Sequence, residues 1–242
     1  MSAERQNTTV WRTGDSNHIL AIEAIIFDMD GLLIDSEPLT DIAFSALMEA
    51  HDCHIDWTPE LIARVQGRRM TEILEIVAGI CGIRTPIAEL SDTLEAHRLE
   101  VIRGNLQAKN GALECIAHMK SAGLPLALAT SGRRSYVDAA LRETGLAGAF
   151  AVEVTGESVT RGKPDPEVYL LAAHTLGIEP AYCVVFEDAP AGIAAAVAAG
   201  MTAVAVPDFY TRDLTFDPPP HAVLPDLHAA IAWLEERQTR PL

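Results

Sequence analysis

FDMDGLLIDSE, residues 27–37, continues an apolar run that begins at Ala24 and places two carboxylates, Asp28 and Asp30, directly after it. A short apolar run that ends in polar residues and glycine is typical of a buried β-strand entering a loop. Four similar runs follow, with helical spacing between them: LPLALAT ending at Thr130, FAVEV ending at Val154, CVVFE ending at Glu187 and MTAVAV ending at Val206. This alternation predicts an α/β fold with three layers, a mainly parallel sheet between two layers of helices.

One long interval, between Asp28 and Leu124, breaks the alternation. It carries helical patterns around residues 39–47, 70–81 and 90–102 and no convincing strand pattern. We therefore expect an inserted α-helical, four-helix-bundle-like cap domain at residues 36–109, and a catalytic core made of residues 21–35 and 110–242. Residues 1–20 are polar and lack apolar periodicity, which predicts a flexible N-terminal extension.

Composition limits the class of protein and its partners. The chain has 242 residues, of which 49% are hydrophobic, so it can form a globular core. Its 18 Lys and Arg residues against 34 Asp and Glu residues give a net charge of −16, which argues against nucleic acid and anionic membranes as partners. The chain shows neither a signal-peptide pattern nor a membrane-spanning run, which predicts a cytoplasmic protein.

The cysteines show no pattern of a disulfide framework or a zinc site. They are far apart in the sequence and none forms a CxxC motif: Cys53, Cys81, Cys115 and Cys183. We expect unpaired thiols without a role in the chemistry.

Polar residues follow several of the predicted strands. In an open parallel sheet, ligands bind beyond the carboxyl ends of the strands. The residues found there are Asp28, Asp30, Ser131, Gly132, Glu187 and Asp188. Four carboxylates in one place repel each other unless a cation compensates, and oxygen ligands suit Mg²⁺. Either acidic motif alone would fit an ordinary turn or helix cap, whereas their joint occurrence at strand ends predicts a magnesium site.

Other readings of these motifs fit less well. GESVTRGKP differs from a phosphate-binding Walker loop, because Pro164 follows Lys163 where Ser or Thr is required. DMDG is not an EF-hand loop, since Leu39 stands where the final Glu ligand should be. Ser131 lacks the flanking glycines of a serine esterase, so that class is not favoured either.

Four motifs occur together and in a diagnostic order: FDMDGLLIDSE at 27–37, ATSG at 129–132, GKPDPEVY at 162–169 and VVFEDAPAGI at 184–193. In these the chain resembles haloacid-dehalogenase-superfamily phosphohydrolases, in the subgroup that contains β-phosphoglucomutase and small sugar-phosphate phosphatases. The resemblance spans about residues 22–235. It implies a Rossmann-like core with an inserted helical cap and a reaction through a covalent carboxyl phosphate.

The resemblance also implies roles for the acidic residues. Asp28 would be the nucleophile, and Asp30 would protonate the leaving group and later take a proton from water. The metal ligands would be Asp28, Asp188 and the backbone carbonyl of Asp30, with Glu187 bound directly or through water. Mg²⁺ is therefore the expected cofactor.

Further residues are expected to contact the phosphate or the substrate. Ser131, the Gly132 amide and Lys163 would hold the phosphoryl oxygens. Arg134 would contact the phosphate or the substrate, although a solvated side chain is an alternative. In the cap, Gly67 and Arg68 of VQGRRM would reach over the substrate, and the alternative there is a plain charged turn.

The predicted function is that of a Mg²⁺-dependent phosphatase that hydrolyses small phosphate monoesters, such as sugar or polyol phosphates. Two alternatives stay open, a β-phosphoglucomutase-type phosphomutase and a 2-phosphoglycolate phosphatase. The mutase relatives carry a histidine ten residues after the second aspartate, where this chain has Thr40, which favours hydrolysis. The expected partner is a small phosphorylated metabolite, and the chain is expected to be a monomer or weak dimer.

Overall fold

The computed structural model describes residues 22–58, 60–61, 64 and 70–238. The chain divides into two compact units. The first, the core unit, consists of Met1–Asp35 and Gln107–Leu242, and the second, the helical unit, of Ser36–Leu106. The predicted extension at residues 1–20 lies outside the described residues.

The core unit is built around a parallel sheet. Within the described residues the sheet has six strands in the order β3-β2-β1-β4-β5-β6, and every pairing is parallel. The strands are β1 Ala24–Phe27, β2 Leu126–Ala129, β3 Val152–Val154, β4 Cys183–Glu187, β5 Thr202–Ala205 and β6 Ala222–Val223. This arrangement confirms the predicted α/β class and adds β6, whose two residues carry no strand pattern in the sequence.

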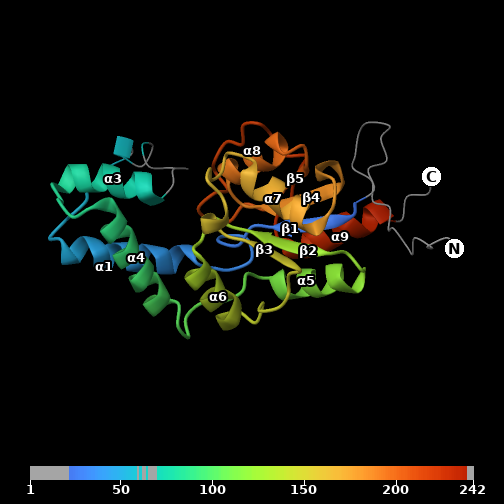
Figure 1. The fold of residues 1–242 in the computed structure, drawn as a ribbon, viewed down its shortest axis with the longest axis horizontal. Helices are drawn as coiled ribbons and strands as arrows, with labels where there is room; N and C mark the ends of the chain where they lie inside the picture. The colour runs from blue at the N-terminus through green and yellow to red at the C-terminus, as the bar shows by residue number, and fades with distance from the viewer. Residues whose placement is uncertain (1–21, 59, 62–63, 65–69, 239–242) are drawn as a thin grey trace. The chain divides into compact units, whose positions relative to one another are not determined.

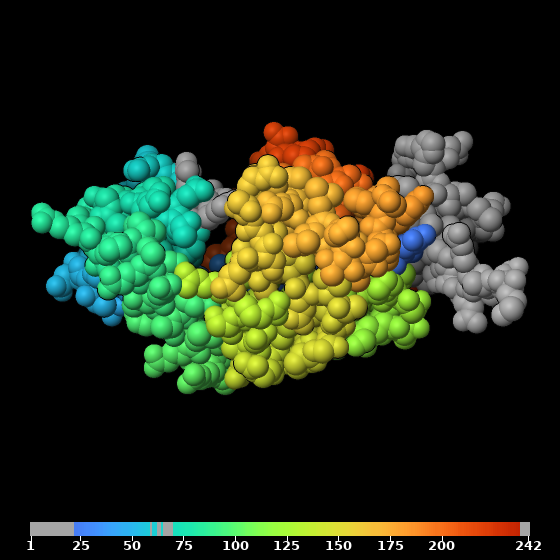
Figure 2. Space-filling view, in the orientation of Figure 1, coloured from blue at the N-terminus to red at the C-terminus, as the bar shows by residue number. Residues whose placement is uncertain are grey.

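Helices cover both faces of the sheet (Figure 1). They are α5 Ala112–Ser121, α6 Arg134–Glu143, α7 Glu167–Leu176, α8 Pro190–Ala198 and α9 Leu227–Gln238, with short 3-10 turns η1 Gly156–Ser158 and η2 Pro180–Tyr182. Helices α7 and α8 pack against one face, where Ile26 and Val185 are buried. On the other face Phe186 contacts Phe27 and Trp233 of α9. In the space-filling view little of the sheet is visible, because the surrounding side chains cover it (Figure 2).

Local sequence explains where the helices next to the site begin and end. Helix α8 starts at Pro190, whose fixed backbone suits a first helical position. Helix α7 follows Pro166 and ends at Gly177, which has the left-handed φ of 73° that a helix terminus favours. Helix α8 therefore begins shortly after Glu187 and Asp188, and α7 shortly after Lys163.

The strand order determines where a ligand can bind. Strand β1 lies between β2 and β4, so the direction in which strands are added reverses beside it. Such a switch point opens a crevice at the carboxyl ends of the strands. Asp28 and Glu187 stand there, on neighbouring strands.

The helical unit contains α1 Glu37–Ala50, α3 Met70–Cys81 and α4 Ile87–Val101. Its core is formed by apolar side chains from all three helices, among them Ala43, Leu47, Leu74, Val77, Leu90 and Leu94. Ile42 and Ile80 also fit the helical patterns but are exposed, because each helix has more apolar residues than its buried face can hold. In the described residues, no helix has both the length and the apolar character needed to cross a membrane.

A disulfide in the helical unit corrects the prediction of unpaired thiols. Cys53, after α1, is bonded to Cys81 at the end of α3, with a Cα–Cα distance of 5.5 Å. The 28-residue separation of the pair carries no motif, and the two residues meet only through the packing of the unit. Cys115 and Cys183 are buried free thiols.

The chain leaves and re-enters the core unit through a paired stem. The Asp35 amide donates to the Gln107 carbonyl over 3.0 Å, and the Lys109 amide donates to the Leu33 carbonyl over 2.9 Å. Ile34 forms an antiparallel bridge with Ala108. These bonds place residues 107–109 with the core unit, whereas the sequence assigned them to the end of the cap.

Candidate active site

Three carboxylates converge at the carboxyl ends of β1 and β4. Asp28 follows β1, Glu187 ends β4 and Asp188 comes next. One oxygen from each lies within 4.8 Å of the others. The three residues are buried, with exposed fractions of 7%, 2% and 5%. Buried acids at such separations repel each other strongly, so the cluster requires positive charge.

Lys163 supplies part of that charge. Its Nζ lies 2.5 Å from Asp28 Oδ1 and 2.8 Å from Glu187 Oε1. The side chain comes from the loop before α7, where Pro164 and Pro166 restrict the backbone. The structure thus brings together Lys163, Asp28 and Glu187, as the motifs predicted.

Burial and charge shift the ionisation of this cluster. Burial raises the pKa of Asp28 to about 8, with a further rise from Glu187, although the Lys163 ammonium opposes both. Burial alone would lower the pKa of Lys163, but the charges of Asp28 and Glu187 outweigh it and hold that pKa well above its usual range. Lys163 is therefore a cation at neutral pH, and Asp28 takes up a proton more readily than an exposed carboxylate does.

Both oxygens of the Glu187 carboxylate accept hydrogen bonds. Its Oε1 accepts from Lys163 and from the Tyr169 hydroxyl at 3.2 Å, and its Oε2 accepts from the Ala189 amide at 2.7 Å. Lys163 Nζ also lies 4.9 Å from the centre of the Tyr169 ring. A Cβ at Gly192 of α8 would collide with the carboxylate. In this arrangement the Glu187 carboxylate is fixed by hydrogen bonds to both of its oxygens.

Asp30 and Gly31 form the turn after Asp28. The Tyr136 hydroxyl donates to Asp30 Oδ1 over 2.8 Å. Gly31 has a left-handed φ of 78°, and a Cβ there would lie 2.6 Å from Asp188 Oδ2. Glycine is thus required on both conformational and steric grounds, and Asp188 can approach the first motif closely.

Ser131 and Gly132 lie beyond β2, beside the η1 turn. The Gly132 amide donates to Thr130 Oγ1 over 3.0 Å, and its carbonyl accepts from the Gly156 amide at 2.9 Å. A Cβ on Gly156 would collide with the Ser131 carbonyl. Gly156, the first residue of GESVTRGKP, therefore packs against the ATSG loop. The Gly132 amide already donates to Thr130 in this structure.

The remaining predicted contacts gain no support from the geometry. The Arg134 guanidinium lies 2.6 Å from Glu153 and 3.2 Å from Asp138, so it is committed to two acids of the core unit. Burial is the largest single influence on the pKa of Arg134 and lowers it, but the hydrogen bonds and charges of Glu153 and Asp138 together outweigh it and raise that pKa. Gly67 and Arg68 lie outside the described residues.

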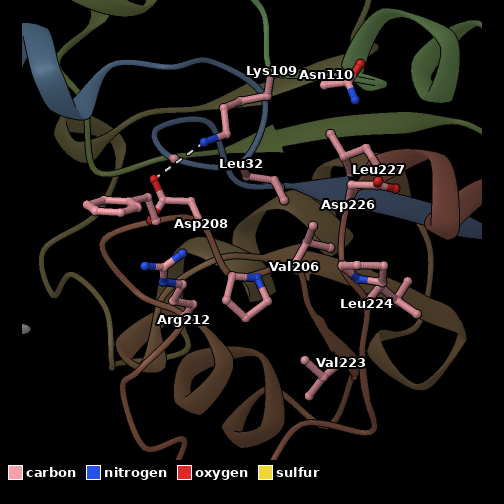
Figure 3. Close-up of a pocket in the computed structure, with 14 residues that line it drawn as sticks. Leu32, Lys109, Asn110, Val206, Asp208, Arg212, Val223, Leu224, Asp226 and Leu227 are labelled. Carbon is pink, nitrogen blue, oxygen red and sulfur yellow. Dashed lines mark hydrogen bonds and ion pairs between the residues drawn. The ribbon is translucent and has the colours of Figure 1, made fainter.

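A cavity of about 670 Å³ adjoins the first motif at Gly31 (Figure 3). Its lining is largely apolar, as with Leu32, and includes the cations of Lys109 and Arg212. Lys109 Nζ lies 3.5 Å from Asp208 Oδ2, as the dashed line in Figure 3 shows. Asp208 also organises the following turn: its Oδ1 accepts from the Thr211 amide at 3.1 Å, and the Thr211 hydroxyl lies 3.5 Å from Asp188 Oδ2.

The donor set fits a hard divalent cation. Asp28, Glu187 and Asp188 offer carboxylate oxygens. Such all-oxygen sets suit Mg²⁺. The excess of buried negative charge over the single lysine is the physical reason a cation would bind.

Sequence reasoning missed three residues of this site. Tyr136 and Tyr169 donate to Asp30 and Glu187, and Gly192 provides the space that Glu187 occupies. Tyr169 closes the GKPDPEVY motif and could have been considered there. Gly192 lies within the VVFEDAPAGI motif and could also have been considered, whereas Tyr136 resembles an ordinary buried helix position for which the sequence offers no signal.

Comparison with known proteins places this geometry in a family context. The model of the haloacid dehalogenase-like hydrolases matches residues 22–200. Hexitol phosphatase A of Escherichia coli (strain K12) is 36% identical over 189 residues, which cover 76% of this chain and 82% of that protein. Protein CbbY of Rhodobacter capsulatus is 36% identical over 220 residues, 87% of this chain and 96% of that protein.

A solved structure shares the fold over most of its length. CbbY from Rhodobacter sphaeroides, in complex with xylulose-(1,5)bisphosphate, is 28% identical with a TM-score of 0.76. The match covers 88% of this chain and 99% of that one.

Proposed function

Because the chain belongs to the haloacid dehalogenase-like hydrolase family, we propose that it is a Mg²⁺-dependent phosphatase of small phosphate monoesters. The observation that carries the proposal is the ion cluster at the ends of β1 and β4. There Lys163 bridges Asp28 and Glu187 at 2.5 and 2.8 Å, with Asp188 in the same cluster. This combination of a buried carboxylate, a fixed ammonium and further acids suits phosphoryl transfer.

In the first half-reaction Asp28 attacks the phosphorus atom. The bond between phosphorus and the ester oxygen breaks, and Asp30 gives its proton to the departing alkoxide, so that an alcohol leaves and an aspartyl phosphate remains. Lys163, which already contacts Asp28, would hold a phosphoryl oxygen and aim the nucleophile. The Ser131 side chain, exposed at the end of β2, would donate to another phosphoryl oxygen.

In the second half-reaction water attacks the aspartyl phosphate. Asp30, now ionised, takes the proton from that water, and the bond between phosphorus and Asp28 breaks to release inorganic phosphate. The enzyme returns to its starting protonation state.

Asp28 and Asp188 would hold the cation, with the Asp30 carbonyl as a further ligand and Glu187 steadying the cluster. When bound, Mg²⁺ screens the repulsion between the Asp28 carboxylate and the phosphate dianion.

The substrate class is drawn from the relatives. Hexitol phosphatase A and the phosphorylated carbohydrates phosphatase of Thermotoga maritima are each 36% identical to this chain. Their names support sugar or polyol phosphates as substrates here. The cytoplasmic location and the monomeric or weakly dimeric state stay predictions, which cell fractionation and size-exclusion chromatography can test.

Phosphate release by the purified chain tests the proposal. We expect Mg²⁺-dependent release of inorganic phosphate from a panel of sugar, polyol and 2-phosphoglycolate substrates. Asp28→Asn should abolish it, because the amide lacks the carboxylate oxygen that forms the acyl phosphate. Turnover that persists in that variant, or in excess EDTA, would refute the assignment.

A second assay separates hydrolysis from phosphoryl transfer to a sugar. β-Glucose 1-phosphate is incubated with the chain and a bisphosphate primer, and glucose 6-phosphate is measured. Steady phosphate release without glucose 6-phosphate supports the phosphatase, and the opposite result supports a phosphomutase.

A further inference from the structure

The hydroxyl of Tyr136 forms a hydrogen bond with the carboxyl group of Asp30. It lies in the first turn of α6, is fully buried, and donates to Asp30 Oδ1 over 2.8 Å. Asp30 itself is only half-buried. A buried hydroxyl thus holds one oxygen of a half-buried carboxyl group.

The ATSG loop makes room for this tyrosine. Gly132 lies next to the Tyr136 ring, and a Cβ at Gly132 would be 3.3 Å from Tyr136 Cδ1 and 3.3 Å from Val137 Cγ2. A side chain at position 132 would have to push the ring aside. The glycine that follows Ser131 therefore allows the Tyr136 ring to pack closely against this loop.

We propose that Tyr136 is a positioning residue for proton transfer by Asp30. The inference rests on the proposed phosphatase function. A carboxylic acid accepts a hydrogen bond best at its carbonyl oxygen, so donation from Tyr136 to Oδ1 favours the transferable proton on Oδ2. Tyr136 acts only as a hydrogen-bond donor in this proposal.

The proton moves between Asp30 Oδ2 and an oxygen of the leaving group or of water. In the first half-reaction the Oδ2–H bond of Asp30 breaks and an O–H bond forms on the departing alkoxide, leaving the electron pair on Oδ2. In the second half-reaction the attacking water gives a proton back to Oδ2. In this proposal the Tyr136 bond occupies Oδ1 throughout, so that Oδ2 is the oxygen that exchanges the proton.

Leaving groups of different basicity distinguish this role from a structural one. An alkoxide, as from sorbitol 6-phosphate, needs a proton as it departs, whereas p-nitrophenolate is stable enough to leave without one. The value of kcat/KM reports the steps up to formation of the aspartyl phosphate, where this difference arises. Both substrates are measured on the same preparation, so loss of folded enzyme lowers both values equally.

The variants are Tyr136→Phe, which removes only the hydroxyl, and Tyr136→Met, which keeps a large apolar side chain without one. Tyr182→Phe, at an exposed position, makes the same chemical change as a control. For both Tyr136 variants we expect kcat/KM for sorbitol 6-phosphate to fall about tenfold to a hundredfold relative to p-nitrophenyl phosphate. An equal fall for both substrates, or no change, would overturn the inference.

A double variant tests whether Tyr136 acts through Asp30. In an Asp30→Ala background, Tyr136→Phe should have no further effect on the ratio of the two kcat/KM values, because the group it orients is gone. A further fall of the ratio in that background would overturn the inference. A wild-type chain that hydrolyses neither substrate would refute the phosphatase function, whereas an active wild type with an unchanged Tyr136→Phe ratio refutes the positioning role alone.

Discussion

Replacing Lys163 by methionine should destabilise the metal-free protein. Lys163 Nζ contacts Asp28 and Glu187, and the side chains of all three residues are at most 9% exposed. Methionine fills a similar volume but leaves the two acids without their ammonium. Removal of one partner from a buried ion pair costs about 3–5 kcal/mol.

The expected loss lies at the lower end of that range. Burial raises the pKa of Asp28 to about 8, and loss of the ammonium, which opposes that rise, would move the pKa higher still. Asp28 can thus take up a proton in place of the lost cation, which limits the penalty. A loss of about 3 kcal/mol corresponds to roughly a hundredfold change in the unfolding equilibrium.

Urea unfolding in EDTA, followed by far-ultraviolet circular dichroism, measures this loss. Lys120→Met serves as a matched control, because Lys120 is exposed and contacts only the Gly148 carbonyl at 3.5 Å among the bonds described. Its effect should stay within about 0.5 kcal/mol. Adding Glu187→Gln to Lys163→Met should recover part of the stability by removing the second buried charge.

Equal stability of Lys163→Met and the wild type in EDTA would contradict this reasoning. It would mean that the two short contacts of Lys163 do not neutralise the buried acids.

Two further changes test the packing and the thiols. Gly192→Ala should lower activity more than tenfold, because a Cβ there collides with the Glu187 carboxylate; Gly79→Ala, with open space around its Cβ, should instead stabilise α3 by about 1 kcal/mol. Retained activity of Gly192→Ala would show that the carboxylate has room to move. Burial raises the pKa of Cys115 and of Cys183 to about 12, so at pH 8 only about one thiol in ten thousand is ionised and maleimide should label neither before unfolding. Mass spectrometry after unfolding without reductant should then find two labels, and four after reduction; four without reductant would contradict the disulfide of the helical unit.

The strands next to the site could be predicted because they are buried on both faces. β1 and β4 have only buried residues, so each appears in the sequence as an unbroken apolar run that ends in an acid. The convergence of Asp28 with Glu187 then follows from parallel pairing. β6, with two residues, is too short to leave such a pattern.

Contacts that depend on the rotational phase of a helix could not be predicted. Arg134 stands beside the ATSG motif, yet the first turn of α6 directs its guanidinium to Glu153 at 2.6 Å. Tyr136 lies two residues further, and the same turn directs its hydroxyl to Asp30. A sequence pattern reports burial, whereas these two contacts depend on where α6 begins and how it packs.

The paired stem has a consequence for how such a chain can change over evolutionary time. Because Asp35 and Gln107 are hydrogen-bonded neighbours, the backbone of the core unit closes at that point whatever the length of the chain inserted there. The closure entropy of an inserted loop grows only slowly with its length. Recombination at this junction could therefore exchange one inserted module for another and leave the β1 turn, with Asp28 and Asp30, in place.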